Sequence, residues 1–324
     1  MKILEVVTEH TGPMKILFEV LKDILTETNI EFRSSQKKID DDSECSEAPD
    51  DETSERNKKK IKKEDQDCMK ITAVDSSKTV LVNLRLDGKN FSKFVCKKNK
   101  LVLGVNLGYF YKLIKSMDKN DILTLSVDHD NKNSLKIKID SPDEKKDTEF
   151  NLKLLDLNEA KTPLPEIVFD AVITMDSQEF NKLCREMNNI ADYVEIKCLP
   201  DKIIFTCQGE FANRKSTYRT NVDEDNENIL VSISHGSTKN NKKGESQCPQ
   251  IVQGIFELRN LVLFSKCATL CNGIEIYMKN DFPLVIKYTV ATLGRILLCL
   301  TPIKEDDTKN ANYSDEDEFY SDED

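Results

Sequence analysis

The sequence predicts an α+β protein of two similar domains, each with two helices packed on antiparallel β-sheets. One observation behind this prediction is a unit of an amphipathic helix followed by β-rich sequence, which recurs four times along the 324 residues. The other is an extended segment at 157–166 with two prolines and no periodic pattern, which separates the first two units from the last two. Four units in two pairs indicate a duplicated domain.

The four helices are predicted from apolar spacing and from signals at their ends. The first runs from 11 to about 27 and opens at Thr-Gly-Pro, with Pro13 near the first helical position. The second covers about 107–117, and the third follows the capping signal that begins at Asp176. The fourth covers about 256–270. On a helical wheel each has one apolar face, which we expect to be buried.

The strands are predicted from alternating apolar residues between turn signals. The first helix precedes strands near 29–33 and 79–86, and each later helix precedes a hairpin. The three hairpins pair 122–127 with 134–139, 193–199 with 203–207, and 274–278 with 284–288. Hairpins of this kind predict antiparallel sheets.

These patterns place an N-terminal domain at 1–152, a connector at 153–166 and a C-terminal domain at 167–303. A charged insertion at 36–69 and an acidic tail at 304–324 have little apolar content, so both are predicted to be disordered. The insertion holds eight basic and twelve acidic residues, and the tail two basic and ten acidic. The net charge of −11 therefore lies mostly in these segments, and the domains can still carry a basic surface.

The composition excludes several classes of function. No apolar run approaches the roughly 20 residues of a membrane span, and the N-terminus lacks the apolar stretch of a secretory signal, so we expect an intracellular protein without a membrane partner. The ten cysteines lie in apolar patterns and suit a reducing compartment. Cys267 and Cys271 have no second ligand pair for zinc, and the three histidines stand beside no nucleophile motif. We predict no enzyme activity, metal or cofactor.

Basic side chains lie opposite the apolar face of every predicted helix. On one helix such a pair is ordinary solvation, but four helices that line one side of a sheet would gather them on a single surface. That surface could hold phosphates without reading bases. The residues are Lys15, Lys22, Lys112, Lys115, Lys182, Arg185, Arg259 and Lys266.

Short motifs across nearly the whole chain resemble the proliferating cell nuclear antigen family, the DNA sliding clamps of eukaryotes, archaea and some large DNA viruses. The most specific are the Leu-Gly-Val-Asn-Leu run at 103–107 and the Leu-Thr-Pro at 300–302 before an acidic tail. The others lie at 21–23, 74–77, 81–82, 154–157, 180, 184–185, 264, 266 and 283–285. The insertion at 36–69 departs from the family.

The resemblance implies the DNA clamp fold: a homotrimeric ring of six similar domains, with helices around the hole and sheets outside. The eight basic residues match its DNA-facing positions, as do Lys146 and Lys153. The protein would encircle duplex DNA without sequence specificity and hold DNA polymerase on it as a processivity factor. A clamp loader and peptide-motif proteins would be its other partners.

The resemblance also implies a subunit interface and a partner-peptide pocket. The interface would pair an edge strand near 146–153 with one near 211–219 and bury Phe150 with Phe211 or Tyr218. The pocket, beneath the connector, would be lined by Val74, Lys78, Leu81, Thr162, Leu164, Pro165, Pro283, Cys299, Leu300, Thr301 and Pro302. Thr162 and Cys299 replace larger residues of the family. Leu81, Pro283 and Leu300 could instead be core residues.

Two other functions stay open at the level of the sequence. One is a subunit of a heterotrimeric checkpoint clamp, which a monomeric purified chain would favour. The other is an unrecognised cysteine-based enzyme, which would need a histidine close to a cysteine. If the protein is a sliding clamp, we expect it in the nucleus or at a viral replication site. The lysine run at 58–63 is either a nuclear import signal or solvated charge.

Overall fold

The structure is a computed structural model that describes residues 1–35, 66–158, 167–220, 231–235 and 251–304. The chain divides into two compact units, and each takes a short segment from the other part of the sequence. The first unit comprises Met1–Ala73, Val82–Thr162 and Thr289–Ile296, and the second comprises Val74–Leu81, Pro163–Tyr288 and Leu297–Asp324. Most of the predicted insertion, more than half of the connector and nearly all of the acidic tail lie outside the described residues.

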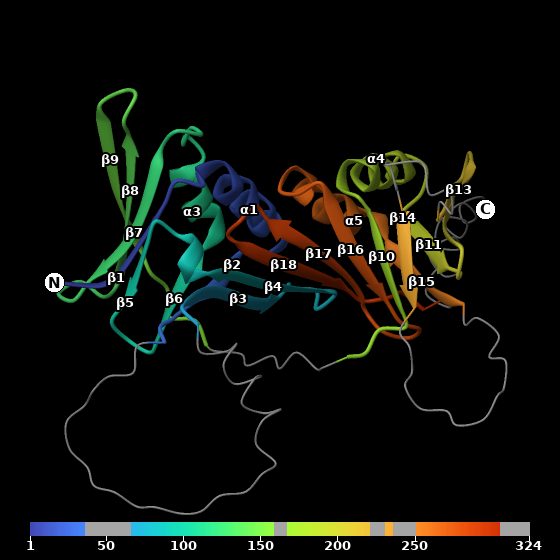
Figure 1. The fold of residues 1–324 in the computed structure, drawn as a ribbon, viewed down its shortest axis with the longest axis horizontal. Helices are drawn as coiled ribbons and strands as arrows, with labels where there is room; N and C mark the ends of the chain where they lie inside the picture. Colours follow the sequence, from blue (N-terminus) through green and yellow to red (C-terminus); the bar gives the residue numbers. More distant parts are fainter. Residues whose placement is uncertain (36–65, 159–166, 221–230, 236–250, 305–324) are drawn as a thin grey trace, which may run out of the picture. The chain divides into compact units, whose positions relative to one another are not determined.

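One order of elements, a strand, a helix and three strands, occurs four times (Figure 1). The first unit contains β1 (Lys2–Thr8), α1 (Thr11–Ile24), β2 (Glu27–Arg33), β3 (Cys68–Val74) and β4 (Val80–Asp87), then β6 (Lys100–Asn106), α3 (Leu107–Ile114), β7 (Ile122–Asp128), β8 (Ser134–Ser141) and β9 (Lys146–Lys153). The second contains β10 (Ala171–Asp176), α4 (Ser177–Asn188), β11 (Tyr193–Cys198), β12 (Lys202–Gln208) and β13 (Asn213–Arg219), then β15 (Val252–Glu257), α5 (Leu258–Ser265), β16 (Gly273–Met278), β17 (Leu284–Val290) and β18 (Gly294–Leu300). Strands β5 (Lys93–Cys96) and β14 (Val231–His235) and two 3-10 turns, η1 (Gly88–Asn90) and η2 (Lys266–Thr269), are additional. The predicted fourfold repetition is confirmed.

Within each unit the two repeats exchange strands. β1 of the first repeat pairs antiparallel with β7 of the second, and β6 of the second pairs with β2 of the first. The second unit repeats this arrangement, since β10 pairs with β16 and β15 with β11. The hairpins then extend the sheets outward, so that β9 and β13 are edge strands. Neither repeat can complete its sheet without its neighbour.

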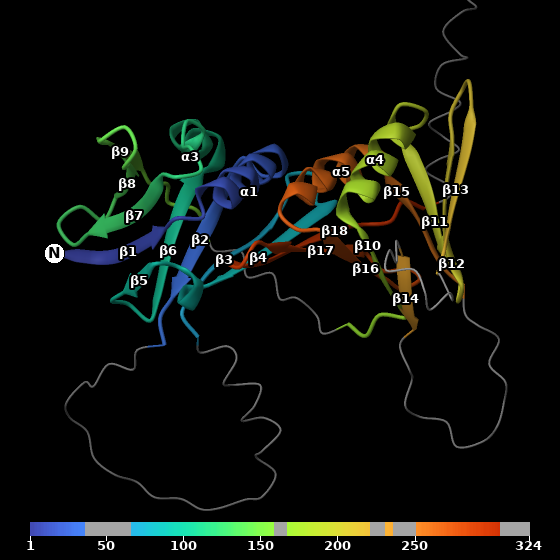
Figure 2. The ribbon, with the colours of Figure 1, turned by 45° about the horizontal axis from the view of Figure 1, so that its top comes forward.

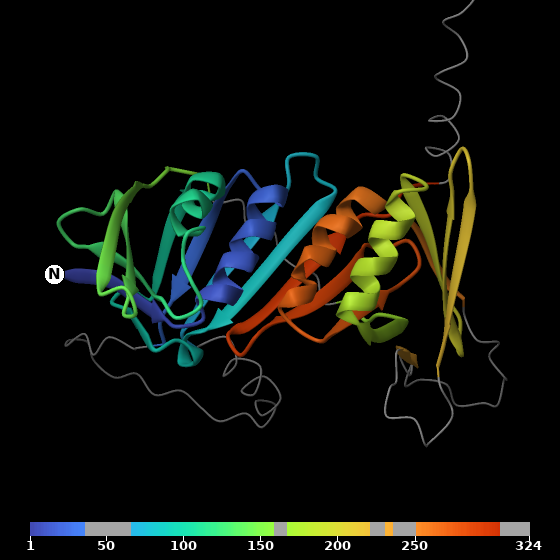
Figure 3. The same ribbon diagram turned by 90° about the horizontal axis from the view of Figure 1, so that it is seen from above.

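The two helices of the first unit lie side by side on one side of its strands (Figure 3). Their apolar faces meet in the core, where the rings of Phe18 on α1 and Phe110 on α3 are 4.4 Å apart. Both side chains are fully buried, as are Leu17 and Leu21. The spacing that predicted these helices is the spacing of their buried residues.

The helices of the second unit are held by packing and by a strong N-cap. The carboxylate of Asp176 accepts hydrogen bonds from the amides of Gln178 and Glu179 at 2.9 and 2.8 Å, which confirms the predicted capping signal. The hydroxyl of Ser177 donates to the carbonyl of Ala268 at 3.0 Å and so ties α4 to η2. The predicted inward faces of α4 and α5 are buried.

Three predicted boundaries are wrong. α1 ends at Ile24 and α3 at Ile114, about a turn early, because Glu27 already pairs with Asn106 in the sheet and the chain turns after Ile114. The fourth helix begins at Leu258, since the two preceding residues belong to β15 and pair with β11.

The predicted insertion ends sooner than the sequence indicated. Cys68 and Met69 are fully buried at the start of β3, which pairs with β2. The carbonyl of Asp67 accepts a hydrogen bond from the amide of Gly88 at 2.7 Å. Residues 66–69 are therefore part of the domain, and the insertion is shorter by that much. The alternation at 68–74 is a strand signal that charge content concealed.

No helix in the described ranges is long and apolar enough to cross a membrane. The same ranges contain no group of three or more His, Cys, Asp or Glu side chains arranged to hold a metal ion.

Candidate nucleic-acid interface and peptide pocket

Helices α1 and α3 carry four of the basic residues predicted to face DNA, and the structure divides them into two kinds. Lys112 on α3 and Lys115, which directly follows the helix as its C-cap, are exposed, and α3 has no acidic residue. Lys15 is half-buried, and its ammonium donates to the carbonyl of Met117 at 3.1 Å. Lys22 pairs with the neighbouring Asp23. Of these four cations, Lys112 and Lys115 are therefore the most available to a ligand.

Among these lysines lies an exposed aromatic ring that was not predicted from the sequence. Tyr109 is 59% exposed, and the ammonium of Lys112 lies 5.5 Å from the centre of its ring. Lys22 lies over Tyr111 in the same way, at 5.1 Å. Cation–π contacts hold both lysine side chains against α3. Two tyrosines interleaved with lysines at 109–115 were the signal in the sequence.

In the second unit, α4 presents Lys182 and Arg185 to solvent. The acids of this helix are engaged elsewhere: Glu186 pairs with Arg214 of β13 at 2.7 Å, and Glu179 accepts a hydrogen bond from Tyr218 at 2.9 Å. Arg214 therefore neutralises Glu186, while Glu179 is hydrogen-bonded to Tyr218 and is half-buried, so Lys182 and Arg185 are the charged side chains that α4 exposes.

The last two basic residues lie at opposite ends of the fourth helix, and only Lys266 falls outside it. Arg259 is highly exposed at the start of α5, where its guanidinium lies 3.4 Å from Glu257. Lys266 is exposed on the 3-10 turn η2 rather than on α5 itself. The exposed ion pair between Arg259 and Glu257 contributes little to stability, so Arg259 can exchange Glu257 for a more strongly bound anion.

The two lysines that the resemblance added lie on β9. Side chains alternate between the two faces of a strand, and Lys146 and Lys153 are separated by an odd number of residue steps. Their side chains therefore project from opposite faces of the sheet. Lys146 also lies 4.0 Å from Glu144. Both lysines cannot point toward the same ligand, and at most one can join the α3 surface, which lies next to β9.

The residues predicted to join subunits lie on the edge strands β9 and β13 or in the turn before β13 (Figure 2). Phe150 on β9 is half-buried. Phe211, in the turn before β13, is 76% exposed. Tyr218 is half-buried and already engaged: its ring packs edge-on against Phe205 at 5.9 Å, and burial raises the pKa of its hydroxyl, an effect that the neighbouring Glu179 increases. Of the two alternatives, Phe211 has the side chain available to a partner.

Most residues of the predicted peptide pocket belong to the second unit. Asp75 organises the turn that contains Lys78. Its carboxylate accepts a hydrogen bond from the amide of Val80 at 2.8 Å and further hydrogen bonds from the hydroxyls of Ser77 and Thr79. The amide of Thr301 donates to the carbonyl of Thr79 at 3.0 Å. These contacts bring the 75–80 turn beside the segment at 301–302.

The side chains of this region differ in exposure. Val74, Lys78 and Thr301 are exposed, and Leu81, Pro283 and Pro302 are half-buried. Cys299 and Leu300 are buried, and burial raises the pKa of the Cys299 thiol to about 11. For Leu300 the alternative of a core residue fits better. Thr162, Leu164 and Pro165 lie outside the described residues.

Two sequence motifs that are distant along the chain meet in the first unit. The amide of Leu155 donates to the carbonyl of Gly104 at 2.9 Å. A Cβ atom at Gly104 would stand 2.2 Å from the carbonyl oxygen of Leu155, so only glycine fits this strand position. The Leu-Gly-Val-Asn-Leu and Leu-Leu-Asp-Leu motifs thus form one packed structural feature.

Two family models together match most of the chain. The model of the proliferating cell nuclear antigen N-terminal domain matches residues 57–162, and that of its C-terminal domain matches 163–303. The chain belongs to the proliferating cell nuclear antigen family. The N-terminal match begins inside the predicted insertion, although β1, α1 and β2 precede it.

Two viral relatives have related names. A "Probable DNA polymerase sliding clamp" of Acanthamoeba polyphaga mimivirus is 31% identical over 308 residues, which are 93% of this chain and 62% of the relative. The "Probable DNA polymerase sliding clamp 1" of Paramecium bursaria Chlorella virus 1 is 29% identical over 239 residues, 72% of this chain and 84% of the relative. The chain thus spans less than two thirds of the mimivirus relative.

Proposed function

We propose that this protein is a DNA sliding clamp, which encircles duplex DNA and tethers DNA polymerase to it. The supporting observation is that, in a chain of this family, the helices of both units carry exposed cations. Lys112, Lys115, Lys182 and Arg185 are exposed, and they come from both units. Long flexible side chains that exchange between phosphates hold a duplex without fixing its position. The role needs neither catalysis nor a cofactor.

A topological hold can be tested directly. The protein is assembled on an immobilised duplex, both ends of the duplex are blocked, and the beads are washed at high salt. We expect the protein to stay until a restriction enzyme cuts the duplex, and then to leave. Release by the wash alone would mean electrostatic attachment rather than encirclement, and would contradict the proposal.

We further propose that three copies close the ring by pairing β9 of one with β13 of the next. Edge strands with unpaired backbone groups are suited to such pairing, and a head-to-tail interface repeats until the ring closes. Light scattering should give three times the 37.1 kDa of one chain. A monomer would favour the heterotrimeric alternative.

Phe211 offers a variant for this interface. Phe211→Ala should shift the protein toward monomer at low concentration, because truncation of a buried aromatic anchor commonly costs about 2 kcal/mol or more. Phe282→Ala is the matched control, since Phe282 is also an exposed phenylalanine in a turn. Equal dissociation of both variants would count against the proposed interface.

We propose that the 75–80 turn, the 301–302 segment and the connector bind short peptide motifs of the polymerase, the clamp loader and other replication proteins. Leu164→Ala should weaken such peptides by about 1 kcal/mol or more in calorimetry. Val168→Ala, at an apolar residue that is 76% exposed, serves as control. Unchanged affinity of the Leu164 variant would refute this assignment. We expect the protein in the nucleus or at a viral replication site, where these partners act.

A further inference from the structure

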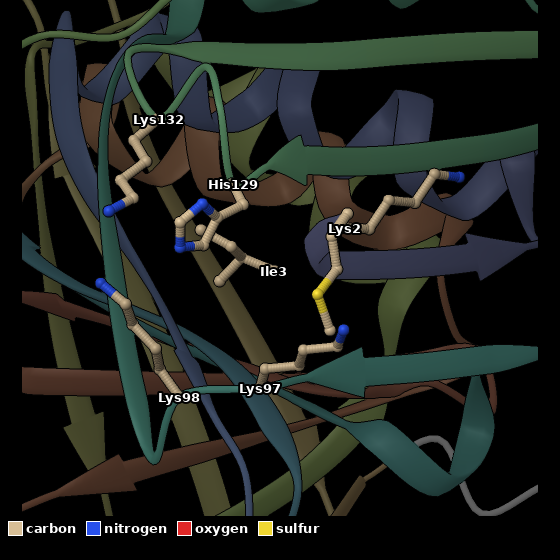
Figure 4. Close-up of a pocket in the computed structure, with 7 residues that line it drawn as sticks. Lys2, Ile3, Lys97, Lys98, His129 and Lys132 are labelled. Carbon is tan, nitrogen blue, oxygen red and sulfur yellow. The ribbon is translucent and has the colours of Figure 1, made fainter.

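A small pocket lies at one end of the first unit, where three segments meet. It is lined by Ile3 and Lys2 of β1, by Lys97 and Lys98 in the turn after β5, and by two residues of the β7–β8 turn, His129 and Lys132, with Met1 at its edge. Its volume is about 200 Å³. Figure 4 shows Lys98 and Lys132 extending on the same side of the His129 ring. None of these residues belongs to the helical surface or to the peptide pocket described above.

The pocket has an excess of positive charge. Lys97, Lys98 and Lys132 are exposed, and no carboxylate in the described part of the chain forms an ion pair with them. Lys2 differs, because it shares Glu5 with Lys93. The acid at the rim is Asp130, 3.6 Å from His129. Three uncompensated ammonium groups around one opening favour an anionic ligand.

The floor of the pocket is apolar, which constrains the ligand further. Ile3 is 6% exposed beneath the lysines, and Met1 adds its thioether chain. A volume of about 200 Å³ is below the roughly 300–1,000 Å³ of ordinary small-molecule sites, so it suits one side chain better than a whole nucleotide. The ligand should combine an apolar or aromatic side chain with flanking negative charges.

We infer that this pocket binds the acidic, aromatic C-terminal segment of this protein, residues 315–324, from the same copy or a neighbouring one. That segment places Phe319 and Tyr320 between Glu318 and Asp322, in a run that contains no basic residue. An aromatic ring would occupy the apolar floor while the carboxylates meet Lys98 and Lys132. The inference does not depend on the sliding-clamp proposal.

The insertion is a competing acidic segment of the chain. Residues 40–55 hold nine acids, and they follow Ser34, whose amide donates to the carbonyl of Asn99, next to Lys98, at 3.1 Å. They contain no aromatic residue, and the apolar Ile39 that precedes them follows Lys37 and Lys38 and so lacks acids on one side. They could neutralise the lysines but would leave the apolar floor uncovered, so the tail satisfies both parts of the pocket.

The tail is long in comparison with a single domain. Twenty residues follow Lys304. Extended, they span about 66 Å, whereas a compact domain of roughly 150 residues has a radius of gyration of about 15 Å. The tail therefore exceeds the width of one such domain.

Zero-length carbodiimide crosslinking of the full chain, read by mass spectrometry, tests the inference. The reagent joins a carboxylate to an amine only where the two are in contact. We expect links from Lys98 and Lys132 to acids at 315–324 to be about tenfold more abundant than links from Lys89 and Lys119, because docking raises the effective concentration of the tail. Lys89 and Lys119 are exposed turn lysines outside the pocket. A mixture of isotope-labelled and unlabelled chains distinguishes one copy from two.

A variant separates the aromatic contribution from charge. Phe319→Ala with Tyr320→Ala keeps every carboxylate, and it should lower the links to Lys98 and Lys132 to the level of the control lysines. Equal links at all exposed lysines, or persistence of the pocket links in this variant, would overturn the inference. Links from 40–55 in place of the tail would assign the pocket to the insertion. Pocket lysines that are protected by pyrophosphate or a DNA duplex, without tail links, would assign it to phosphate groups.

Discussion

Removal of three exposed cations from the helical faces is the perturbation that most directly probes the DNA-binding surface. Lys115, Lys182 and Arg185 are suited to it, because they are exposed and form no ion pair within the described residues. Lys22 would be a poorer choice, since it already pairs with Asp23. The variant replaces all three with alanine.

The magnitude follows from counterion release. Each phosphate contact contributes about 0.9 to the slope of log affinity against log salt, so loss of three contacts lowers the slope by about 2.7 per copy. Between roughly 50 and 200 mM salt, this difference corresponds to a factor of about 40 in affinity. The variant should therefore bind duplex DNA much more weakly at low salt and approach the unmodified protein as salt rises.

Fluorescence anisotropy of a labelled duplex across this salt range measures both slopes. Light scattering on the same samples checks that the oligomeric state is unchanged. The control replaces Lys89, Lys119 and Lys145, three exposed turn lysines, with alanine and removes the same charge. If the helix variant keeps the original slope, or if the control loses as much, the helical faces are not where phosphates bind.

Three further predictions concern stability and are measured by urea unfolding. Gly104→Ala should destabilise the first unit by about 1–3 kcal/mol, because its Cβ would meet the carbonyl of Leu155; Gly12→Ala, with nothing within 4 Å, should be nearly neutral. Asp176→Ala should cost about 1 kcal/mol through loss of the α4 N-cap, and Asp176→Asn should restore most of it. Burial raises the pKa of the Asp75 carboxyl, but its hydrogen bonds outweigh burial and hold that pKa below the ordinary value of 3.8. Asp75 therefore stabilises the fold fully above pH 3.8, and this stabilisation is lost as the pH falls through the lower folded pKa. In Asp75→Asn, this pH-dependent loss of stability should disappear.

The cations of α4 show how much of the candidate site could be predicted. Lys182 and Arg185 lie opposite Phe180 on the helical wheel, and the structure leaves them exposed. That orientation depends on local periodicity alone, because burial of the apolar face fixes the opposite face. Their availability depended on a tertiary contact, because Arg214 of β13 forms an ion pair with Glu186 of the helix. The role of these residues in DNA binding stays a prediction.

Periodicity and capping determined the helices, the hairpins and the fourfold repeat, since each depends on residues a few positions apart. Only the tertiary structure decided which strands pair, because β1 and β7 are over a hundred residues apart and their register depends on partners that no local pattern specifies. Only the tertiary structure likewise decided that the ammonium of Lys15 donates a hydrogen bond to the carbonyl of Met117. It also decided that the turns carrying Lys98 and Lys132 meet in one pocket. Short-range spacing sets the orientation of a side chain within its own element, whereas long-range packing sets its partners.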